Sequence, residues 1–290
     1  MIDWNSTGSV TEIQGTILQL EKLRSHAAAL GCHLGPSSRI AIFERHLRRF
    51  LIPGYHPRSD PHFDPALLAH GSRDLFELNF ICDKLAKDHP TELRRALPDL
   101  MSGAPTPSAD GGNRLARNLQ FQFFLAGQLA HSGYSITLEE PDAIFVFEGA
   151  AYGVAAKRPI SAQQVVRRVR DAVRQLAREN LTGFIALSLD GLLRSPDPYV
   201  VAAGEAALDM AAKTHLQQAF APHARAVQRA IGGTNVTGLI VSLTLVGCVR
   251  VPWQPAHTTA TLWLPREDDL PREEQVVQTI VKGLSGPSLN

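Results

Sequence analysis

The sequence predicts an α/β protein in which an all-helical N-terminal domain precedes a domain built on a mixed β-sheet. Apolar residues recur at helical spacing over residues 10–100, whereas short runs of strand character alternate with helices after residue 112. Between these parts, residues 102–112 have the Pro, Gly and small-residue composition of a flexible linker. We therefore predict a helical domain with its linker at 1–110 and a sheet-containing domain at 111–290.

Four helices are expected in the first domain. They fall near residues 10–30, 38–52, 75–85 and 91–100. Thr11 and Gln14 form a capping-box pattern at the start of the first helix, and Ser38 precedes the second. Residues 56–64 gather His and Asp side chains, but two prolines and the lack of a nearby cysteine pair favour an ordinary loop over a zinc site.

The second domain begins with an αβββαβ core. Its elements are expected as a helix at 115–133, strands at 134–138, 143–147 and 151–157, a helix at 161–179 and a buried strand at 184–189. Further elements cover the sheet, namely helices at 202–220 and 223–231, strands at 239–245 and 259–264, and a last helix from about Arg272.

Composition excludes several classes of protein. The chain has 44% hydrophobic and 20% charged residues and a formal net charge of +1, which excludes wholesale disorder and binding to nucleic acid through bulk charge. The start carries an acidic Asp3 and no apolar segment, and the longest near-apolar stretch, 236–249, is too short to span a membrane. We therefore expect a cytoplasmic protein that does not bind membranes, with its three separated cysteines reduced.

One constellation in the second domain combines residues that suit phosphodiester chemistry. Pro141-Asp142 stands at the head of one expected strand, and Lys157 lies at the end of the next. Strand alternation places Ala155 and Lys157 on the same face. With the element order, this pattern resembles the PD-(D/E)xK superfamily of restriction-endonuclease-like proteins over residues 113–190.

The resemblance implies a metal-dependent nuclease site. Asp142 would hold Mg or Mn, and Lys157 would orient the attacking water or stabilise charge on the phosphate. Ala155 stands where the first acid of the (D/E)xK motif belongs, and Gln122 stands at the position of a further helical carboxylate. The motif is therefore degenerate, since Asp142 is its single acidic ligand and one carboxylate holds magnesium weakly.

The residues leave the origin of this degeneracy open. The chain is a degenerate family member, or an acid has migrated, or position 155 carries an inactivating substitution. Glu139 and Glu140 could line the mouth of the cleft, whereas Glu148 lies about 20 Å along the strand from Asp142, too far to share a metal.

A basic stripe on the helix at 161–179 indicates phosphate contacts. Its members are Arg167, Arg170, Arg174 and Arg178. Arg158 could contact a further backbone phosphate. The alternative interpretation is a solvated helix face paired with nearby acids.

Three functions follow from this sequence. The first is a bacterial-type restriction-endonuclease-like protein that hydrolyses DNA or RNA with Mg or Mn. The second is a catalytically impaired pseudo-nuclease that binds nucleic acid or a protein, which the missing acids favour. The third is an interaction module that contacts a protein through its N-terminal helices; the resemblance also implies a possible homodimer.

Overall fold

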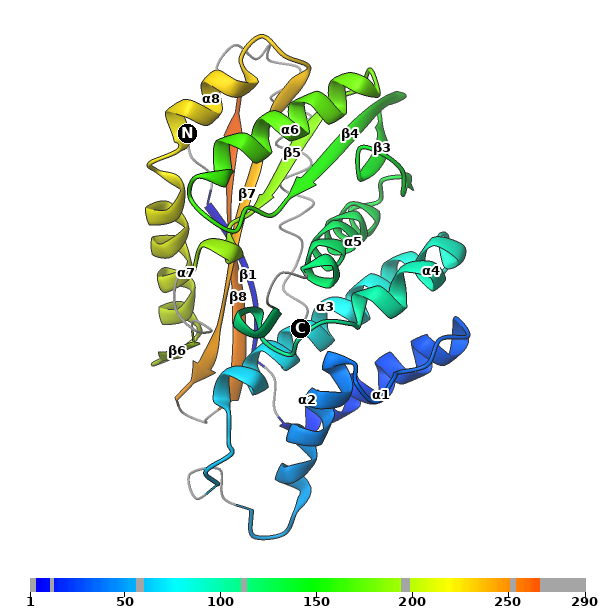
Figure 1. Cartoon of the computed structure of the whole chain (residues 1–290), viewed down its shortest axis with the longest axis vertical. Helices are drawn as coiled ribbons and strands as arrows, with labels where there is room; N and C mark the ends of the chain where they lie inside the picture. The colour runs from blue at the N-terminus through cyan, green and yellow to red at the C-terminus, as the bar shows by residue number, and fades with distance from the viewer. Residues whose placement is uncertain are drawn as a thin grey trace.

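A mixed β-sheet forms the centre of the molecule (Figure 1). The computed structural model describes residues 4–10, 13–55, 60–110, 114–193, 199–250 and 254–266. Within these ranges the strand order is β1-β8-β7-β5-β4-β3-β2, and β6 pairs with β7 outside that path. The strands are β1 (Trp4–Val10), β2 (Ile136–Thr137), β3 (Ala143–Phe147), β4 (Ala150–Lys157), β5 (Thr182–Ser188), β6 (Tyr199–Ala202), β7 (Val236–Val249) and β8 (Gln254–Pro265).

Parallel pairing at the centre of the sheet is flanked by antiparallel pairing on both sides. Strands β4, β5 and β7 are parallel neighbours, while β2, β3 and β4 form one antiparallel set and β7, β8 and β1 another. From α5 to β5 the elements follow the predicted order of helix, three strands, helix and strand. The prediction of a mixed α/β sheet is therefore confirmed.

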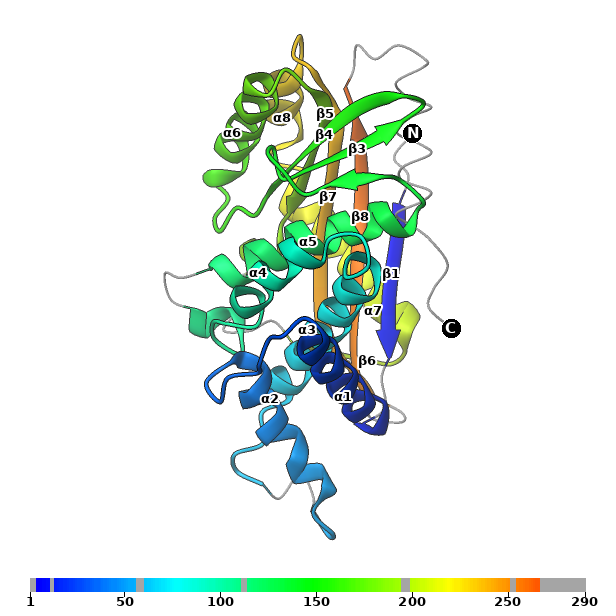
Figure 2. The same cartoon turned by 90° about the vertical axis from the view of Figure 1, so that its right-hand side faces the viewer.

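Helices cover both faces of this sheet. They are α1 (Ile13–Ala29), α2 (Arg39–Leu47), α3 (Pro65–Leu85), α4 (Pro90–Leu100), α5 (Leu115–His131), α6 (Gln164–Arg178), α7 (Glu205–Phe220) and α8 (Ala224–Ile231). Figures 1 and 2 show α6, α7 and α8 on one side and α3, α4 and α5 on the other. No helix in the described ranges is long and apolar enough to cross a membrane.

Strand alternation divides the buried side chains into two hydrophobic clusters. Ala156, Ala186 and Ile240 face the cluster that includes the cores of α1 to α5, whereas Ala155 and Ile185 face the cluster under α6, α7 and α8. The first cluster extends from Leu20 to Trp263. The predicted ranges 1–110 and 111–290 therefore share one hydrophobic core.

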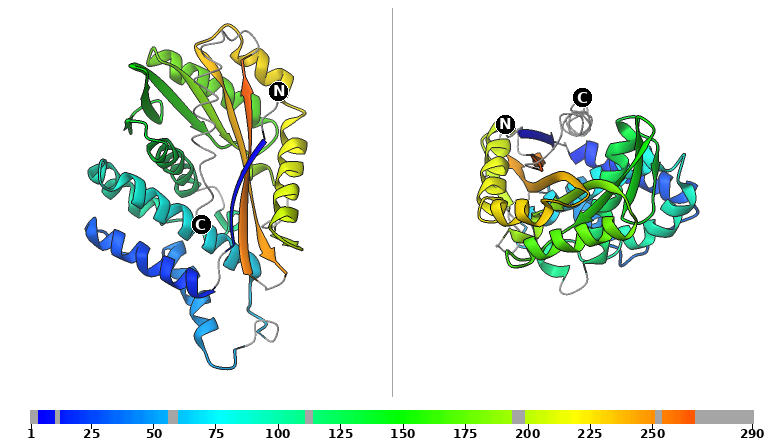
Figure 3. Two further views of the ribbon diagram at one scale, coloured as in Figure 1. Left: turned by 180° about the vertical axis from the view of Figure 1, so that it is seen from behind. Right: turned by 90° about the horizontal axis from the view of Figure 1, so that it is seen from above.

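The prediction that the N-terminal part is all helical is wrong at its start. Residues 4–10 form β1, an edge strand that pairs antiparallel with β8 from Trp4↔Leu262 to Val10↔Ala256 (Figure 3). The segment WNSTGSV lacks the alternating apolar residues that signal a strand. It is a strand because its main chain pairs with β8, a partner that the local sequence does not reveal. The helix expected from Arg272, and Thr11 of the expected capping box, lie outside the described residues.

Other boundaries also differ from the prediction. Helix α3 begins at Pro65, because Oδ1 of Asp64 accepts a hydrogen bond from the Leu67 amide at 3.0 Å and proline suits the first helical turn. Strands β7 and β8 are longer than expected, and β6 was not expected at all. All three cysteines are buried and free, as predicted.

A buried ion network fixes α3 to its neighbours. Asp74 lies 3.3 Å from Nη1 of Arg39 and 3.4 Å from Nη1 of Arg117, and it accepts a hydrogen bond from Nε2 of Gln120 at 3.1 Å. Burial alone would raise the pKa of Asp74, but the guanidiniums of Arg39, Arg117 and Arg73 outweigh it and hold that pKa below its ordinary value. The carboxylate therefore remains ionised inside the protein.

One residue earlier on the helix, Arg73 joins α3 to the sheet. Its Nε lies 2.6 Å from Oε1 of Glu77, and its Nη2 lies 2.8 Å from Oδ2 of Asp190. Oδ1 of Asp190 accepts a hydrogen bond from the Thr244 amide on β7 at 2.8 Å. Asp190 therefore connects helix α3 to the sheet, through the ion pair with Arg73 and the hydrogen bond from Thr244.

Removal of the carboxylate at the centre of this network is expected to be strongly destabilising. Asp74→Ala leaves Arg39 and Arg117 without their buried partner and should lower the free energy of unfolding by about 3–5 kcal/mol. Asp83→Ala on the same helix, which breaks an exposed pair with Lys22, should cost about 0–1 kcal/mol. Urea unfolding measures both, and equal losses would contradict the prediction.

A buried histidine predicts how stability changes with pH. His257 of β8 contacts the ring of Phe76, and burial, with the positive charge of Arg73 adding to it, lowers its pKa to about 3. The unfolded chain takes up a proton near pH 6.5 and the folded chain does not, so stability falls below pH 6.5 by up to about 1.4 kcal/mol per pH unit. This loss continues until the pH approaches the folded-state pKa.

His257→Leu is expected to reduce the slope of unfolding free energy against pH by about one proton between pH 6 and 4. Urea unfolding at several pH values measures the slope. The control is His215→Leu, which removes an imidazole from the exposed side of α7. A slope reduced no further by His257→Leu than by the control would sink the prediction.

Candidate functional site

The hairpin of β3 and β4 positions the predicted acidic residue. Ala143 pairs with Val154, so Asp142, which immediately precedes β3, lies beside the end of β4. The turn between the strands is made by Glu148 and Gly149, both at positive φ, as the turn signal at these residues predicted. Asp142 is thereby held next to the strand that ends at Lys157.

Three of the predicted site residues meet at this carboxylate. Oδ1 of Asp142 accepts a hydrogen bond from Nε2 of Gln122 at 2.8 Å. Its Oδ2 accepts from the Ala156 amide at 2.7 Å and from Nζ of Lys157 at 3.2 Å. The structure thus brings together Gln122 of α5, Asp142 just before β3 and Lys157 of β4, and their catalytic roles stay predictions.

Burial dominates the electrostatics of this group. The side chains of Asp142 and Lys157 are only 14% and 16% exposed. Burial raises the pKa of Asp142, the Lys157 ammonium and the Ala156 amide oppose that rise, and the negative charge of Glu140 adds to it. Asp142 and Lys157 therefore form a half-enclosed ion pair at the end of β4.

Position 155, where the resemblance predicts an acid, does not line this site. Ala155 is fully buried and belongs to the hydrophobic cluster under α6, together with Val165 and Val169. A carboxylate at this position would be buried among apolar side chains, which is energetically unfavourable, and would not simply add a metal ligand beside Asp142. Packing against α6 therefore accounts for an apolar residue at position 155.

The side chains around Asp142 do not fit a tightly held divalent ion. Both of its oxygens already accept protein hydrogen bonds, one of them from an ammonium. Glu140 lies close enough to affect Asp142, but its Oε2 accepts from Nε2 of Gln175 at 2.5 Å. Within the described ranges no group of three His, Cys, Asp or Glu side chains could hold a metal ion.

The predicted basic residues fall into two places. Arg167, Arg170 and Arg174 are exposed on α6, where Arg174 pairs with Asp171 at 2.5 Å. Arg158 instead lines a pocket on the opposite side of the sheet, where it acts electrostatically on Asp190. The structure does not place Arg158 with the α6 stripe.

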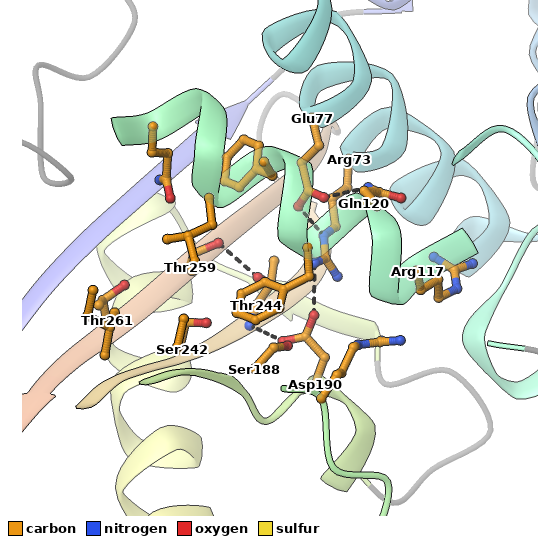
Figure 4. A pocket seen from close by; sticks show the side chains of 17 residues that line it. Arg73, Glu77, Arg117, Gln120, Ser188, Asp190, Ser242, Thr244, Thr259 and Thr261 are labelled. Atoms are coloured by element: carbon orange, nitrogen blue, oxygen red, sulfur yellow. Dashed lines mark hydrogen bonds and ion pairs between the residues drawn. The ribbon is translucent and has the colours of Figure 1, made fainter. Parts of the chain in front are cut away.

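This pocket was not predicted. It lies between α3, α5 and strands β5, β7 and β8 (Figure 4). Its polar lining includes Ser188 on β5, Ser242 and Thr244 on β7, and Thr259 and Thr261 on β8. Ser242 and Thr244 stand at alternate positions of β7, and Thr259 and Thr261 at alternate positions of β8, a signal that could have marked one polar patch on the sheet.

The loop at 56–64 acts as an ordinary loop in its described part. Oδ1 of Asp60 accepts from the His62 amide at 2.8 Å, its Oδ2 accepts from the Tyr55 hydroxyl at 2.8 Å, and Asp64 caps α3. These carboxylates stabilise the turn and the helix start.

No family model matches this chain, and no match was found among curated proteins or solved structures.

The ion pair predicts a change in the acidity of Asp142. Lys157→Gln removes the ammonium that opposes the effect of burial, so the pKa of Asp142 should rise further. A carbon-detected NMR titration of the carboxyl group measures this pKa. Lys84→Gln on α3 is the control, and an unchanged pKa of Asp142 in Lys157→Gln would contradict the ion pair.

Proposed function

We propose that this chain is a restriction-endonuclease-like protein that binds nucleic acid and lacks efficient cleavage. The convergence of Gln122, Asp142 and Lys157 carries the proposal, because it places the PD-like aspartate and the motif lysine at one point of an αβββαβ core. These residues come from three elements that are separate in the sequence. Two of them match the motif, and the third matches the helical position that accompanies it.

The charge on α6 supports contact with a nucleic-acid backbone. The helix carries Arg167, Arg168, Arg170, Arg174 and Arg178 against one acid, Asp171. Phosphate contacts from such a stripe give affinity without base specificity. A chain with a formal net charge of +1 has to concentrate its positive charge locally to bind DNA or RNA, and α6 does so.

Binding without cleavage follows from the chemistry around Asp142. Hydrolysis in this superfamily requires carboxylates that neutralise a divalent ion beside the phosphate. Asp142 is the single carboxylate of the motif, and the Lys157 ammonium already neutralises it. The retained lysine can still contact a phosphate oxygen, which favours a binding role.

Metal-dependent hydrolysis with Mg or Mn is the second candidate. The contact between Asp142 and Lys157 favours it, because these are the two residues of the motif that the chain retains. An interaction through the N-terminal helices is the third, and exposed Leu18 on α1 is one apolar side chain that a protein partner could cover.

The α6 stripe predicts a salt-dependent affinity for nucleic acid. Arg167→Gln/Arg170→Gln should weaken binding to single- and double-stranded oligonucleotides and reduce the slope of log affinity against log salt by about 1–2. Fluorescence anisotropy at several salt concentrations measures both. Arg94→Gln/Arg95→Gln on α4 removes the same charge from another surface and serves as the matched control.

Cleavage of the same oligonucleotides and of plasmid is assayed with Mg and with Mn. We expect binding and no cleavage. Cleavage that Asp142→Asn and Lys157→Gln both abolish would establish the second candidate instead. Loss of affinity that is equal in the α6 and α4 variants, or no binding at all, would overturn the proposal.

A further inference from the structure

Helix α8 adds to the basic surface of α6. The two helices pack against each other at one end of the sheet (Figure 2), and Leu176 of α6 and Val227 of α8 belong to one hydrophobic cluster. The sides that face away from this cluster carry the arginines. These are Arg167, Arg170, Arg174 and Arg178 on α6 and Arg225 and Arg229 on α8, all of them exposed. We call the surface that they form the α6–α8 face.

Most of these guanidiniums are not neutralised by the protein. Arg174 pairs with Asp171 at 2.5 Å, and the partly exposed Arg168 lies 3.5 Å from the same carboxylate. Within the described ranges, the other five arginines of the α6–α8 face make no ion pair or hydrogen bond through their side chains. The two helices together hold seven arginines and one acid, Asp171, and Glu179 directly follows α6. The α6–α8 face therefore attracts anions.

The apolar sides of both helices are already used by the fold. Val169 and Ala172 of α6 and Val227 of α8 are fully buried against the sheet. A helix that binds a lipid surface needs an exposed apolar side that enters the membrane interface. The α6–α8 face therefore suits an anion that presents its charges in water, as a nucleic-acid backbone does.

This face lacks the side chains that hold single strands. Neither α6 nor α8 contains Phe, Tyr or Trp. Proteins that bind single-stranded nucleic acid without base specificity stack its bases on aromatic side chains. Arginines on a rigid surface contact phosphates instead, and a duplex carries one phosphate charge per about 1.7 Å of its axis, twice the density of one strand. The composition of the face therefore favours a duplex.

The dimensions of the face also fit a duplex. Helix α6 has 15 residues and is about 22 Å long, which matches about six to seven base pairs. Packed helices lie about 8–10 Å apart, and the two grooves of B-DNA are about 6 and 12 Å wide. This separation allows arginines of α6 and of α8 to contact the two strands that border one groove.

We propose that the α6–α8 face binds the two backbones of double-stranded nucleic acid without reading its sequence. This inference rests on the proposed function and deepens it, because it names the substrate class and adds α8 to the binding surface. Helix α8 contributes two positive charges and no acid. Phosphate contacts carry no base information, so duplexes of different sequence bind alike.

The test compares a DNA duplex of about 20 base pairs, roughly three times the length of α6, with each of its strands alone. Fluorescence anisotropy with the full chain measures the affinities. We expect the duplex to bind at least about fivefold more tightly than either strand, with a steeper dependence of log affinity on log salt. A duplex of unrelated sequence should bind with the same affinity.

Variants of α8 test its share of the surface. Arg225→Gln/Arg229→Gln should weaken duplex binding about tenfold and reduce the salt slope by about 1–2. Arg225→Lys/Arg229→Lys keeps both charges and should retain most of the affinity, which separates a role of the charge from a role of the side-chain shape. Arg94→Gln/Arg95→Gln on α4 is the matched control. The thermal midpoints of all three variants should match that of the wild type, because the replaced side chains are exposed.

The outcomes separate this inference from the proposed function. Binding that depends on Arg167 and Arg170 but is no tighter for the duplex than for its strands, or is unchanged by the glutamines on α8, would overturn the inference alone. Absence of oligonucleotide binding would overturn the proposed function as well. Vesicles of phosphatidylglycerol and phosphatidylcholine are the last probe. Binding to them that depends on α8, without duplex binding, would assign the face to a lipid surface and overturn the inference.

Discussion

The buried charges of α3 are the constraint on which the arrangement of this molecule depends. Asp74 holds Arg39 of α2 and Arg117 of α5, while Arg73 reaches Asp190, two residues beyond β5. Buried ion pairs contribute little net stability compared with apolar residues of the same shape, but removal of one partner is strongly destabilising. The network therefore acts chiefly to fix the relative positions of α2, α3, α5 and the sheet. Their buried charges are all paired only when these elements pack in this arrangement.

Helix α5 links the buried ion network to the pocket and to the Asp142 site. Arg117 and Gln120 bind the α3 carboxylates, the next residue, Phe121, forms part of the pocket wall, and Gln122 donates to Asp142. These residues occupy less than two turns of one helix, so one short segment of α5 contributes to the ion network, the pocket and the Asp142 site. A shift of α5 relative to α3 would leave buried charges unpaired, which makes such a shift costly.

The sequence predicted what local patterns encode and missed what depends on distant partners. Alternation and turn residues around 136–157 were sufficient for the hairpin, and hence for the meeting of Asp142 and Lys157. Strand β1 was missed because its apolar pattern is weak and its order comes from pairing with β8, more than 240 residues away in the chain. The pocket was missed because its hydroxyls are set side by side only by the registers of β5, β7 and β8.

Packing explains why position 155 carries an apolar residue. Ala155 is fully buried in the cluster that Val165 and Val169 of α6 share. A glutamate there would need both space and a partner for its charge, and an unpaired buried carboxylate is neutralised or destabilises the fold. Lys157, two residues further along the chain, is already paired with Asp142. An acid at 155 would therefore have to share that ammonium with Asp142 or stay unpaired among apolar side chains. The apolar packing of α6 against Ala155 and the pairing of Asp142 with Lys157 are thus mutually consistent, since neither requires a second carboxylate at this point of the sheet.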